Sequence, residues 1–436
     1  MYSIPGRYRG ARLALLVTGL LVGSVASAAA QGLYYKEITK DGRIYVFNIA
    51  ANAERFEKSG EMGVGITKPG AGPNGETVIG DNERALQLFF FKHGIAEPVP
   101  DPPPPAAAAP PWRISGLVFG DYYSFIDSHL PAWDGQNGLW FRRIYFTYDH
   151  TFTPQITTRV RFEVNSNGKL QGGALTPYIK DAYFRWTYHG RQQLTAGIHP
   201  STTFEFEEIV WGLRHIEKTP LDLYRTDSSR DTGATLSGPL NESQTWKYAF
   251  QFGNDASQNS ETDKFKTIRA AVRYETNPGF SVEFVAGQYY RALDADRTLA
   301  QIFAAYRAKK GRVGFQYTYQ KRRPANNTTA ADIDLDIYSV FGVYDLKVQK
   351  YSVFVRYDRF DDACGDCAGN PPAVDYLPLD STAPFGLTIA GFEYYLIPSL
   401  RFSPNIEYVS YSNPTNPALT RPKNDNVFRM TFYWTW

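Results

Sequence analysis

The feature that most constrains this chain is a two-residue hydrophobic period that recurs from Ile114 to the last residue. The final segment shows the period most clearly, because the apolar residues Phe428, Met430, Phe432, Trp434 and Trp436 alternate with Val427, Arg429, Thr431, Tyr433 and Thr435. Such alternation places apolar side chains on one face of a β-strand and polar side chains on the other. The charged face requires water and the aromatic face requires an apolar phase, which predicts strands between two different surroundings.

Sixteen segments carry this pattern, near 114–125, 139–151, 155–166, 177–189, 192–200, 231–239, 244–253, 266–276, 280–291, 298–308, 312–322, 334–345, 349–360, 386–397, 399–411 and 425–436. Tight connections alternate with long ones, as in outer-membrane barrels. A soluble sandwich or propeller is the alternative, but it explains less well why strand after strand has an apolar outward face. We therefore predict an all-β fold: a 16-stranded antiparallel transmembrane β-barrel over 113–436, with a small N-terminal α+β periplasmic domain.

The first thirty residues have the layout of a secretory signal peptide. Three arginines precede an apolar run over 13–25, and small residues follow it up to Ala30. This order predicts a signal peptide over 1–30 with cleavage before Gln31, so that the mature protein leaves the cytoplasm. A membrane anchor is the alternative interpretation of the same run.

Residues 31–96 are predicted to form the small periplasmic domain. Lys40-Asp41-Gly42 is a hairpin signal between two short strands, and Asp81 is a candidate cap for a helix that ends at Gly94. The segment 70–75 fits a glycine-rich nucleotide motif but lacks a strand-to-helix context, which favours a tight surface loop. The Pro/Ala-rich segment 97–112 is predicted to be a semi-rigid linker.

Composition excludes several classes of protein. Lys and Arg number 46 against 44 for Asp and Glu, so bulk charge gives no basis for nucleic-acid binding. No 18-residue apolar run follows the N-terminus, which argues against a helical membrane protein. Two cysteines are too few for a disulfide scaffold.

Sixteen strands make a barrel wide enough for an aqueous channel, so the charged strand positions are predicted to line a pore. The predicted pore-lining residues are Arg143, Arg159, Arg161, Arg185, Arg269, Arg273, Arg307, Arg356, Arg429, Glu163 and Asp181. All inward charges together, with Lys247, Arg401, Asp121, Asp149, Glu275, Glu283, Asp358 and Glu407 added, make eleven positive against eight negative. The excess favours anions. The alternative is a lumen of mutually neutralising pairs with weak selectivity.

The third long connection, 201–230, is predicted to fold inward and narrow the pore. Its candidate constriction residues are Glu205, Glu207, Glu208, Arg214, His215, Lys218, Arg225 and Arg230. A pure anion site would carry Lys and Arg without carboxylates. The mixed signs therefore suggest a loop that sets the size of the pore more than its charge preference.

The remaining reactive residues predict no chemistry. Cys364 and Cys367 lie three apart in a long loop outside the cytoplasm, which favours a structural disulfide over a redox or zinc site. The six histidines have no metal-ligand spacing, and no Ser-His-Asp set can be assembled. We predict no metal, no cofactor and no enzyme.

Several segments resemble the phosphate-selective porin O and P family. The resemblance rests on Phe141-Arg142-Arg143, Ile179-Lys180-Asp181-Ala182-Tyr183, Thr195-Ala196-Gly197-Ile198-His199-Pro200, Glu217-Lys218 and Arg230-Asp231-Thr232-Gly233 in this order, and covers about 114–436. It implies a sixteen-stranded, trimeric channel whose third loop bends into the lumen. The family's phosphate-specific members are similar to one another in a lysine cluster at the constriction, whereas the third loop here offers only Lys218.

The sequence thus predicts an outer-membrane porin for passive diffusion of small solutes, leaning to anions such as phosphate. The alternative is a barrel-anchored structural protein whose periplasmic domain, residues 31–96, contacts peptidoglycan or a partner protein. The expected partners are outer-membrane lipids, small anionic or neutral solutes and two further copies in a homotrimer, with no nucleic acid.

Overall fold

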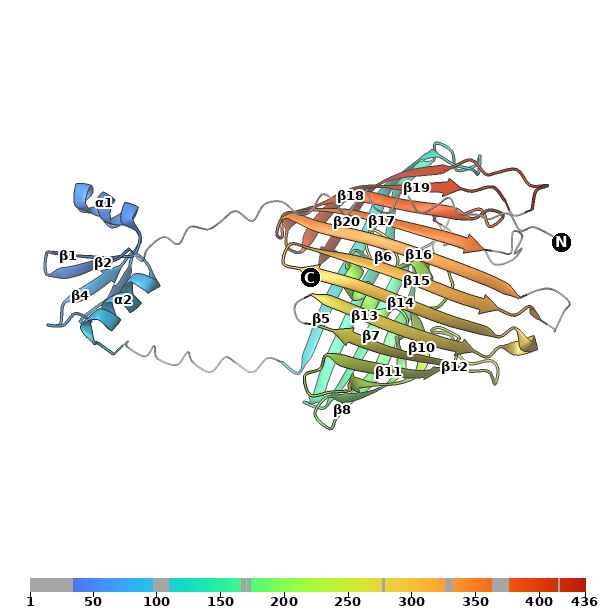
Figure 1. Ribbon diagram of the computed structural model, residues 1–436, viewed down its shortest axis with the longest axis horizontal. Coiled ribbons are helices and arrows are strands. Elements are labelled where there is room, and N and C mark those ends of the chain that lie inside the picture. The colour runs from blue at the N-terminus through green and yellow to red at the C-terminus, as the bar shows by residue number, and fades with distance from the viewer. Residues whose placement is uncertain are drawn as a thin grey trace, which may run out of the picture. The chain divides into compact units, whose positions relative to one another are not determined.

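The computed structural model describes residues 34–96, 110–165, 170, 174–276, 279–325, 332–362, 376–414 and 416–436. The chain divides into two units between residues 108 and 109, and each is described by itself (Figure 1). The predicted signal peptide, most of the predicted linker and the predicted disulfide between Cys364 and Cys367 lie outside the described residues.

The N-terminal unit is a four-stranded sheet in the order β1-β2-β4-β3, with β2 and β4 parallel. Its elements are β1 (Lys36–Lys40), β2 (Arg43–Phe47), α1 (Ala50–Ser59), β3 (Ile66–Lys68), β4 (Thr77–Gly80) and α2 (Glu83–His93). Consecutive residues of β2 point to opposite faces and pack against different helices. Val46 lies in the cluster formed with α2, and Phe47 contacts Phe56 of α1. The two helices therefore cover opposite faces of the sheet.

Two details of this unit correct the sequence prediction. The side chain that caps α2 is Asn82, which accepts a hydrogen bond from the backbone N–H of Ala85. Asp81 instead accepts from the backbone N–H groups of Asn48 and Ile49, just before α1, a helix that the sequence analysis did not predict. Gly94 does end α2, with a left-handed φ of 62°.

The second unit is a closed antiparallel barrel of sixteen strands, each paired with its neighbour along the chain and β20 paired with β5 (Figure 1). The strands are β5 (Trp112–Asp127), β6 (Asn137–Thr153), β7 (Ile156–Asn165), β8 (Thr176–Tyr188), β9 (Gln192–Pro200), β10 (Arg230–Pro239), β11 (Trp246–Gly253), β12 (Thr267–Glu275), β13 (Phe280–Tyr289), β14 (Arg297–Ala308), β15 (Gly311–Arg322), β16 (Ile333–Lys347), β17 (Tyr351–Asp362), β18 (Phe385–Ile397), β19 (Leu400–Tyr411) and β20 (Asp425–Thr435). This confirms the predicted fold, and every predicted strand end lies within two residues of the observed one.

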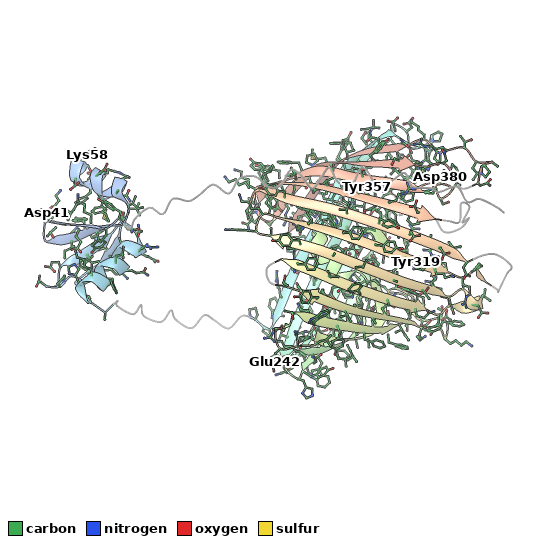
Figure 2. All side chains as sticks on the ribbon, in the orientation of Figure 1. Asp41, Lys58, Glu242, Tyr319, Tyr357 and Asp380 are labelled. Carbon is green, nitrogen blue, oxygen red and sulfur yellow. The ribbon has the colours of Figure 1, made fainter. Side chains whose placement is uncertain are left out.

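The outer wall of the barrel is apolar and aromatic, as the alternation predicts. Outward side chains such as Phe284, Phe315 and Val355 are each about half exposed, and Tyr357, labelled in Figure 2, is 43% exposed. No helix among the described residues is long and apolar enough to cross a membrane.

Two β-bulges break the alternation on adjacent parts of the wall. In β6, Arg142 has no partner in the register with β5, and in β8, Lys180 has none in the register with β7. A bulge makes two consecutive side chains face the same way. As a result Arg142 and Arg143, and likewise Lys180 and Asp181, all lie buried on the inner face.

Loop L3, residues 201–229, leaves the wall after β9 and fills much of the lumen before it returns at β10. It contains the short helices α3 (Glu205–Trp211) and α4 (Pro220–Leu223). Residues 376–384 of the loop before β18 also lie inside the barrel. A 3-10 turn, η1 (Ala292–Asp294), lies between β13 and β14.

The interior of the barrel contains a large hydrophobic core. Inward residues of the wall, including Phe303, Phe341 and Phe354, join Trp211 of L3 and Leu377 of the later loop in one buried cluster. The alternation predicts an inner face that is mostly polar. The apolar inner positions of β14–β18 are instead covered by the two loops, which removes them from water.

Candidate pore constriction

Arg142, the extra residue of the β6 bulge, attaches L3 to the wall. Its guanidinium lies 2.6 Å from Asp121 of β5 and donates to the carbonyl oxygens of His215 and Ile216. Arg142 is 2% exposed. A buried arginine that binds both a carboxylate and two loop carbonyls fixes the position of the loop as well as neutralising charge.

Glu217 is a second buried attachment point. Its carboxylate accepts a hydrogen bond from the Tyr376 hydroxyl at 2.6 Å and lies 3.9 Å from Arg142 and 3.6 Å from Arg429. Burial by itself raises the pKa of a carboxyl group, but the two guanidinium groups prevail and lower the pKa of Glu217. The carboxylate is therefore charged and holds L3, β6, β20 and the 376–384 segment together.

Apolar packing attaches the two helices of L3. The Trp211 ring lies against Phe341, with centroids 5.0 Å apart, and is 1% exposed. The Tyr224 ring packs against Phe360 and Phe385, and its hydroxyl donates to Asp358 of β17 at 2.7 Å. The loop thus adopts one position against β14–β18.

The end of L3 is held by Asp227, which pairs with Arg269 of β12 at 2.8 Å and accepts from the Tyr289 hydroxyl. On the opposite side of the loop, His215 lies 2.6 Å from Glu393 of β18. These contacts attach L3 to widely separated parts of the wall.

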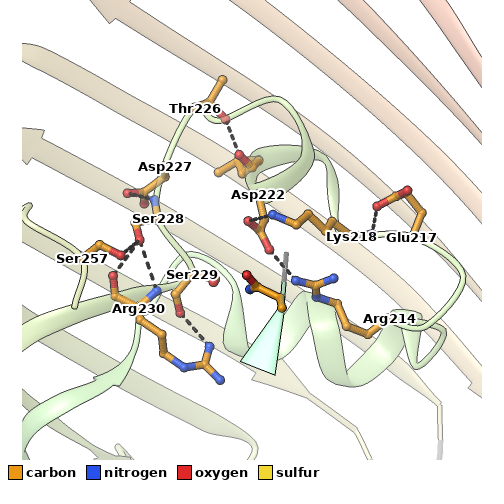
Figure 3. Close-up of polar contacts among 12 residues, drawn as sticks. Arg214, Glu217, Lys218, Asp222, Thr226, Asp227, Ser228, Ser229, Arg230 and Ser257 are labelled. Carbon is orange, nitrogen blue, oxygen red and sulfur yellow. Dashed lines mark hydrogen bonds and ion pairs between the residues drawn. The ribbon is translucent and has the colours of Figure 1, made fainter. Parts of the chain in front are cut away.

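The face of L3 that is turned toward β6–β8 carries a small ion-pair network (Figure 3). Asp222 pairs with Lys218 and with Arg214, both at 2.8 Å, and Arg214 also reaches Glu208 at 3.2 Å. Burial lowers the pKa of Lys218 to about 8, since the nearby Arg143 and Arg214 add to desolvation and outweigh the attraction of Asp222. The Lys218 ammonium group is therefore charged at pH 7 and loses its proton as the pH rises through about 8.

The wall opposite this face supplies a matching network. Lys180, the extra residue of the β8 bulge, lies 3.2 Å from Glu163, which also pairs with Arg143. Asp181 lies 3.3 Å from Arg161 and pairs with the first residue of β10, Arg230, at 2.5 Å.

The gap between these two networks lies where two chambers meet. The chamber of about 390 Å³ toward the long loops and the chamber of about 760 Å³ toward the short turns share the lining residues Lys180 and Ser229. Among the described residues the gap carries six cations against four carboxylates: Arg143, Arg161, Lys180, Arg214, Lys218 and Arg230 against Glu163, Asp181, Glu208 and Asp222.

The eight predicted constriction residues do not lie in one cluster. Arg214, Lys218 and Glu208 face the gap, and Arg230 joins them from β10 rather than from the loop itself. His215 and Glu207 are buried against the wall. Glu205 lines a third chamber, and Arg225 lines the chamber toward the long loops.

The predicted pore-lining residues all lie on the inner face, but five of them are at most 2% exposed and do not reach open space. Two of the five are the carboxylates Glu163 and Asp181, which are held in ion pairs. Arg269, Arg356 and Arg429 are at most 2% exposed, because L3 covers them, and they bind the loop or its neighbours. Most of the others are paired on the wall: Arg143 with Glu163, Arg159 with Asp149, Arg161 with Asp181, Arg273 with Glu283 and Arg307 with Glu275. Arg185 has no carboxylate partner among the described residues.

Sequence reasoning missed Arg142 and Lys180, because strict alternation turns both toward the lipid. The signal was present in the segments Phe141-Arg142-Arg143 and Ile179-Lys180-Asp181, where two charged residues follow one another inside an apolar-out strand. A charge on the lipid face is costly, so consecutive charges in such a strand indicate a bulge.

Comparison with solved structures identifies the fold. The chain is similar to an anion-selective porin from Comamonas acidovorans, with a TM-score of 0.56, 12% identity, and coverage of 74% of this chain and 99% of that one. It is also similar to the outer-membrane channel DcaP of Acinetobacter baumannii (TM-score 0.53, 12% identity, 74% and 97%) and to Salmonella typhi OmpF in complex with daunomycin (TM-score 0.52, 13% identity, 74% and 97%). The barrel therefore has the porin architecture.

No protein-family model and no curated protein match the chain. The structural neighbours support a sixteen-stranded porin barrel in general. The resemblance to the phosphate-selective porin O and P family stays a prediction.

Proposed function

We propose that this protein is an outer-membrane porin that admits small solutes by passive diffusion and prefers anions. The observation that carries the proposal is the gap between L3 and β6–β8, where six cations face four carboxylates. Rings of charge at the narrowest part of a pore set its ion preference. The N-terminal unit would lie in the periplasm, since an even number of strands returns the chain to the side from which it enters the barrel.

Phosphate is one candidate anion rather than the assigned solute. Glu163 and Asp222 lie within the cation network and each neutralises cations on its own side of the gap. A mixed network attracts anions more weakly than a cluster of lysines and arginines alone. Homotrimer assembly, implied by the resemblance, belongs to this proposal.

The test is single-channel recording of the purified full-length protein in a planar bilayer, with the reversal potential measured across a KCl gradient. We expect conductance steps, a reversal potential of the sign given by chloride preference, and concentration-dependent block if phosphate binds in the gap. Lys180→Glu should shift the reversal potential toward potassium. The control Lys58→Glu makes the same change in net charge on the N-terminal unit, where Lys58 is exposed (Figure 2).

Folded protein without conductance would reject the porin proposal. It would favour the second candidate, a barrel-anchored protein whose N-terminal unit binds peptidoglycan or a partner. That candidate is favoured by the separate hydrophobic clusters of the N-terminal unit, which form without the barrel. It predicts that the full chain co-sediments with isolated peptidoglycan and that a chain lacking residues 34–96 does not.

A further inference from the structure

A third chamber, of about 460 Å³, lies toward the short turns and shares no described lining residue with the two chambers of the constriction. Helix α3 divides it from its neighbour. Phe206 and Ile209 line the third chamber, whereas Glu208 and Gly212 line the other. A solute in the third chamber is thus outside the path through the gap.

One part of this chamber offers unsatisfied hydrogen-bond acceptors. Glu205 makes no hydrogen bond and no ion pair among the described residues, and Glu283 has only Arg273, at 3.5 Å. Glu205, Glu283 and His199 all line this chamber.

His199 adds a buried and unpartnered nitrogen to these carboxylates. Its ring is 1% exposed, its Nδ1 lies 3.0 Å from the Pro200 carbonyl oxygen and 3.5 Å from the Gln251 amide nitrogen, and its Nε2 has no partner. The shorter contact is to a carbonyl, which only accepts, so it favours the proton on Nδ1 and a lone pair on Nε2 of the neutral ring. Two carboxylates and this lone pair together suit an ammonium group, which has three N–H donors.

The same chamber has a cation without a carboxylate. Arg185 of β8 donates to the Thr195 hydroxyl at 3.0 Å and has no carboxylate partner among the described residues. Arg185 lines the chamber together with His199. A free guanidinium is well suited to bind a carboxylate. The other cations that line the chamber are Arg191, Lys247 and Arg273; Lys247 pairs with Glu275, and Arg273 lies 4.0 Å above the Phe206 ring.

We propose that this chamber binds a zwitterionic amino compound of the size of an amino acid to a short peptide. The ammonium group lies among Glu205, Glu283 and His199, and the carboxylate lies on Arg185. A simple anion leaves the acceptors of Glu205, Glu283 and His199 unused, and a simple cation leaves Arg185 unused, so a molecule that carries both charges makes more contacts than either. The site is separate from the constriction, and this inference goes beyond the proposed porin function.

The experiment is equilibrium binding to the full-length protein in detergent, by titration calorimetry, with glycylglycine as the probe. N-acetylglycine keeps only the carboxylate and glycinamide keeps only the ammonium group. We expect glycylglycine to bind about ten-fold more tightly than either, the effect of losing one charge-assisted hydrogen bond. Equal affinities for the three probes, or no binding of glycylglycine, would overturn the proposal.

Two variants locate the site. Glu205→Gln should remove the advantage of glycylglycine over N-acetylglycine, and Arg185→Gln its advantage over glycinamide. Glu205 is exposed and makes no contacts that folding needs, so its variant keeps the barrel intact. Glu242→Gln, in an exposed turn outside the chamber, is the matched control (Figure 2). Full binding by both variants would also reject the site.

This readout does not require ion flow. A protein that binds glycylglycine but shows no conductance would contradict the porin proposal and keep the zwitterion site. A conducting protein without binding would do the opposite.

Discussion

The inner walls of β6–β8 and of β14–β18 belong to the same barrel and obey the same alternation, yet they have opposite chemistry. The first carries the ion-pair network of Arg143, Glu163, Lys180 and Asp181. The second presents residues such as Phe303, Phe341 and Phe354, which L3 and residues 376–384 cover. The difference shows that this barrel narrows its pore by packing a hydrophobic core into one side of the lumen.

The two walls also hold their loops by different forces. On the apolar side, burial of Trp211 and Tyr224 supplies the hydrophobic contribution. On the charged side, buried pairs such as Arg142 with Asp121 fix register and position, because a buried charge left without its partner is strongly destabilising. The constriction therefore depends on an apolar wall that no solute contacts.

Removal of the loop should have the largest effect. Replacing residues 203–228 by a short Gly/Ser segment takes away α3, α4 and the face that carries Lys218, and leaves the apolar wall exposed to water. We expect single-channel conductance to rise several-fold and chloride preference to fall. Deleting residues 416–421, in the exposed loop before β20, should leave conductance unchanged. Unchanged conductance after the first deletion would mean that L3 does not constrict the pore.

The apolar half can be tested with one tryptophan on each face of the wall. Trp211→Ala leaves a cavity between L3 and β16 and should cost about 3–5 kcal/mol of unfolding free energy. Trp186→Ala, on the lipid-facing side of β8, where the ring is 46% exposed, should cost less. The measurement is reversible urea unfolding in lipid vesicles. Equal losses would show that the loop core adds no special stability.

The charged half can be tested by charge reversal on β7. Arg159→Glu combined with Arg161→Glu should lower the chloride-to-potassium permeability ratio roughly five-fold, as expected for about 1 kcal/mol between charges 4 Å apart in water. The matched control is Lys321→Glu with Arg359→Glu, which reverses two charges on the outer wall. A ratio that stays constant on β7 would show that these arginines do not act on the permeating ion.

The smallest expected effect concerns the pH dependence of selectivity. Because burial lowers the pKa of Lys218 to about 8, its charge is present at pH 7 and lost as the pH rises through that value. Chloride preference should fall modestly over this range. Lys218→Arg keeps the charge and should remove the dependence, and Lys218→Gln should show the lower preference at every pH. Reversal potentials at a series of pH values decide between these outcomes.

Much of the barrel could be predicted from the sequence, because the hydrophobic pattern of a strand involves only neighbouring residues. The period of two located all sixteen strands, and the inward face of residues such as Arg161 and Arg273 followed from it. The bulges were not accessible in the same way. A single inserted residue reverses the alternation beyond it, so the alternation did not predict Arg142 and Lys180 on the inner face.

The positions of the constriction residues depend on contacts between residues that lie far apart in the sequence. The length and composition of the third loop predicted that it folds inward, but its eight candidate residues do not act as one site. Lys218 and Arg214 face the gap, whereas His215 reaches Glu393 and Glu207 is buried at the wall. Which side of a loop faces water depends on the surface against which the loop packs.

The sequence by itself determined the number of strands, their limits and the apolar outer wall, because each of these follows from the surroundings of neighbouring residues. Only the tertiary structure decided where the open path runs, which arginines line it and which hold L3, and how α3 divides the chambers. These features arise where residues far apart in the chain compete for the same interior space. Closure of the barrel brings such residues together, and no local pattern records the result.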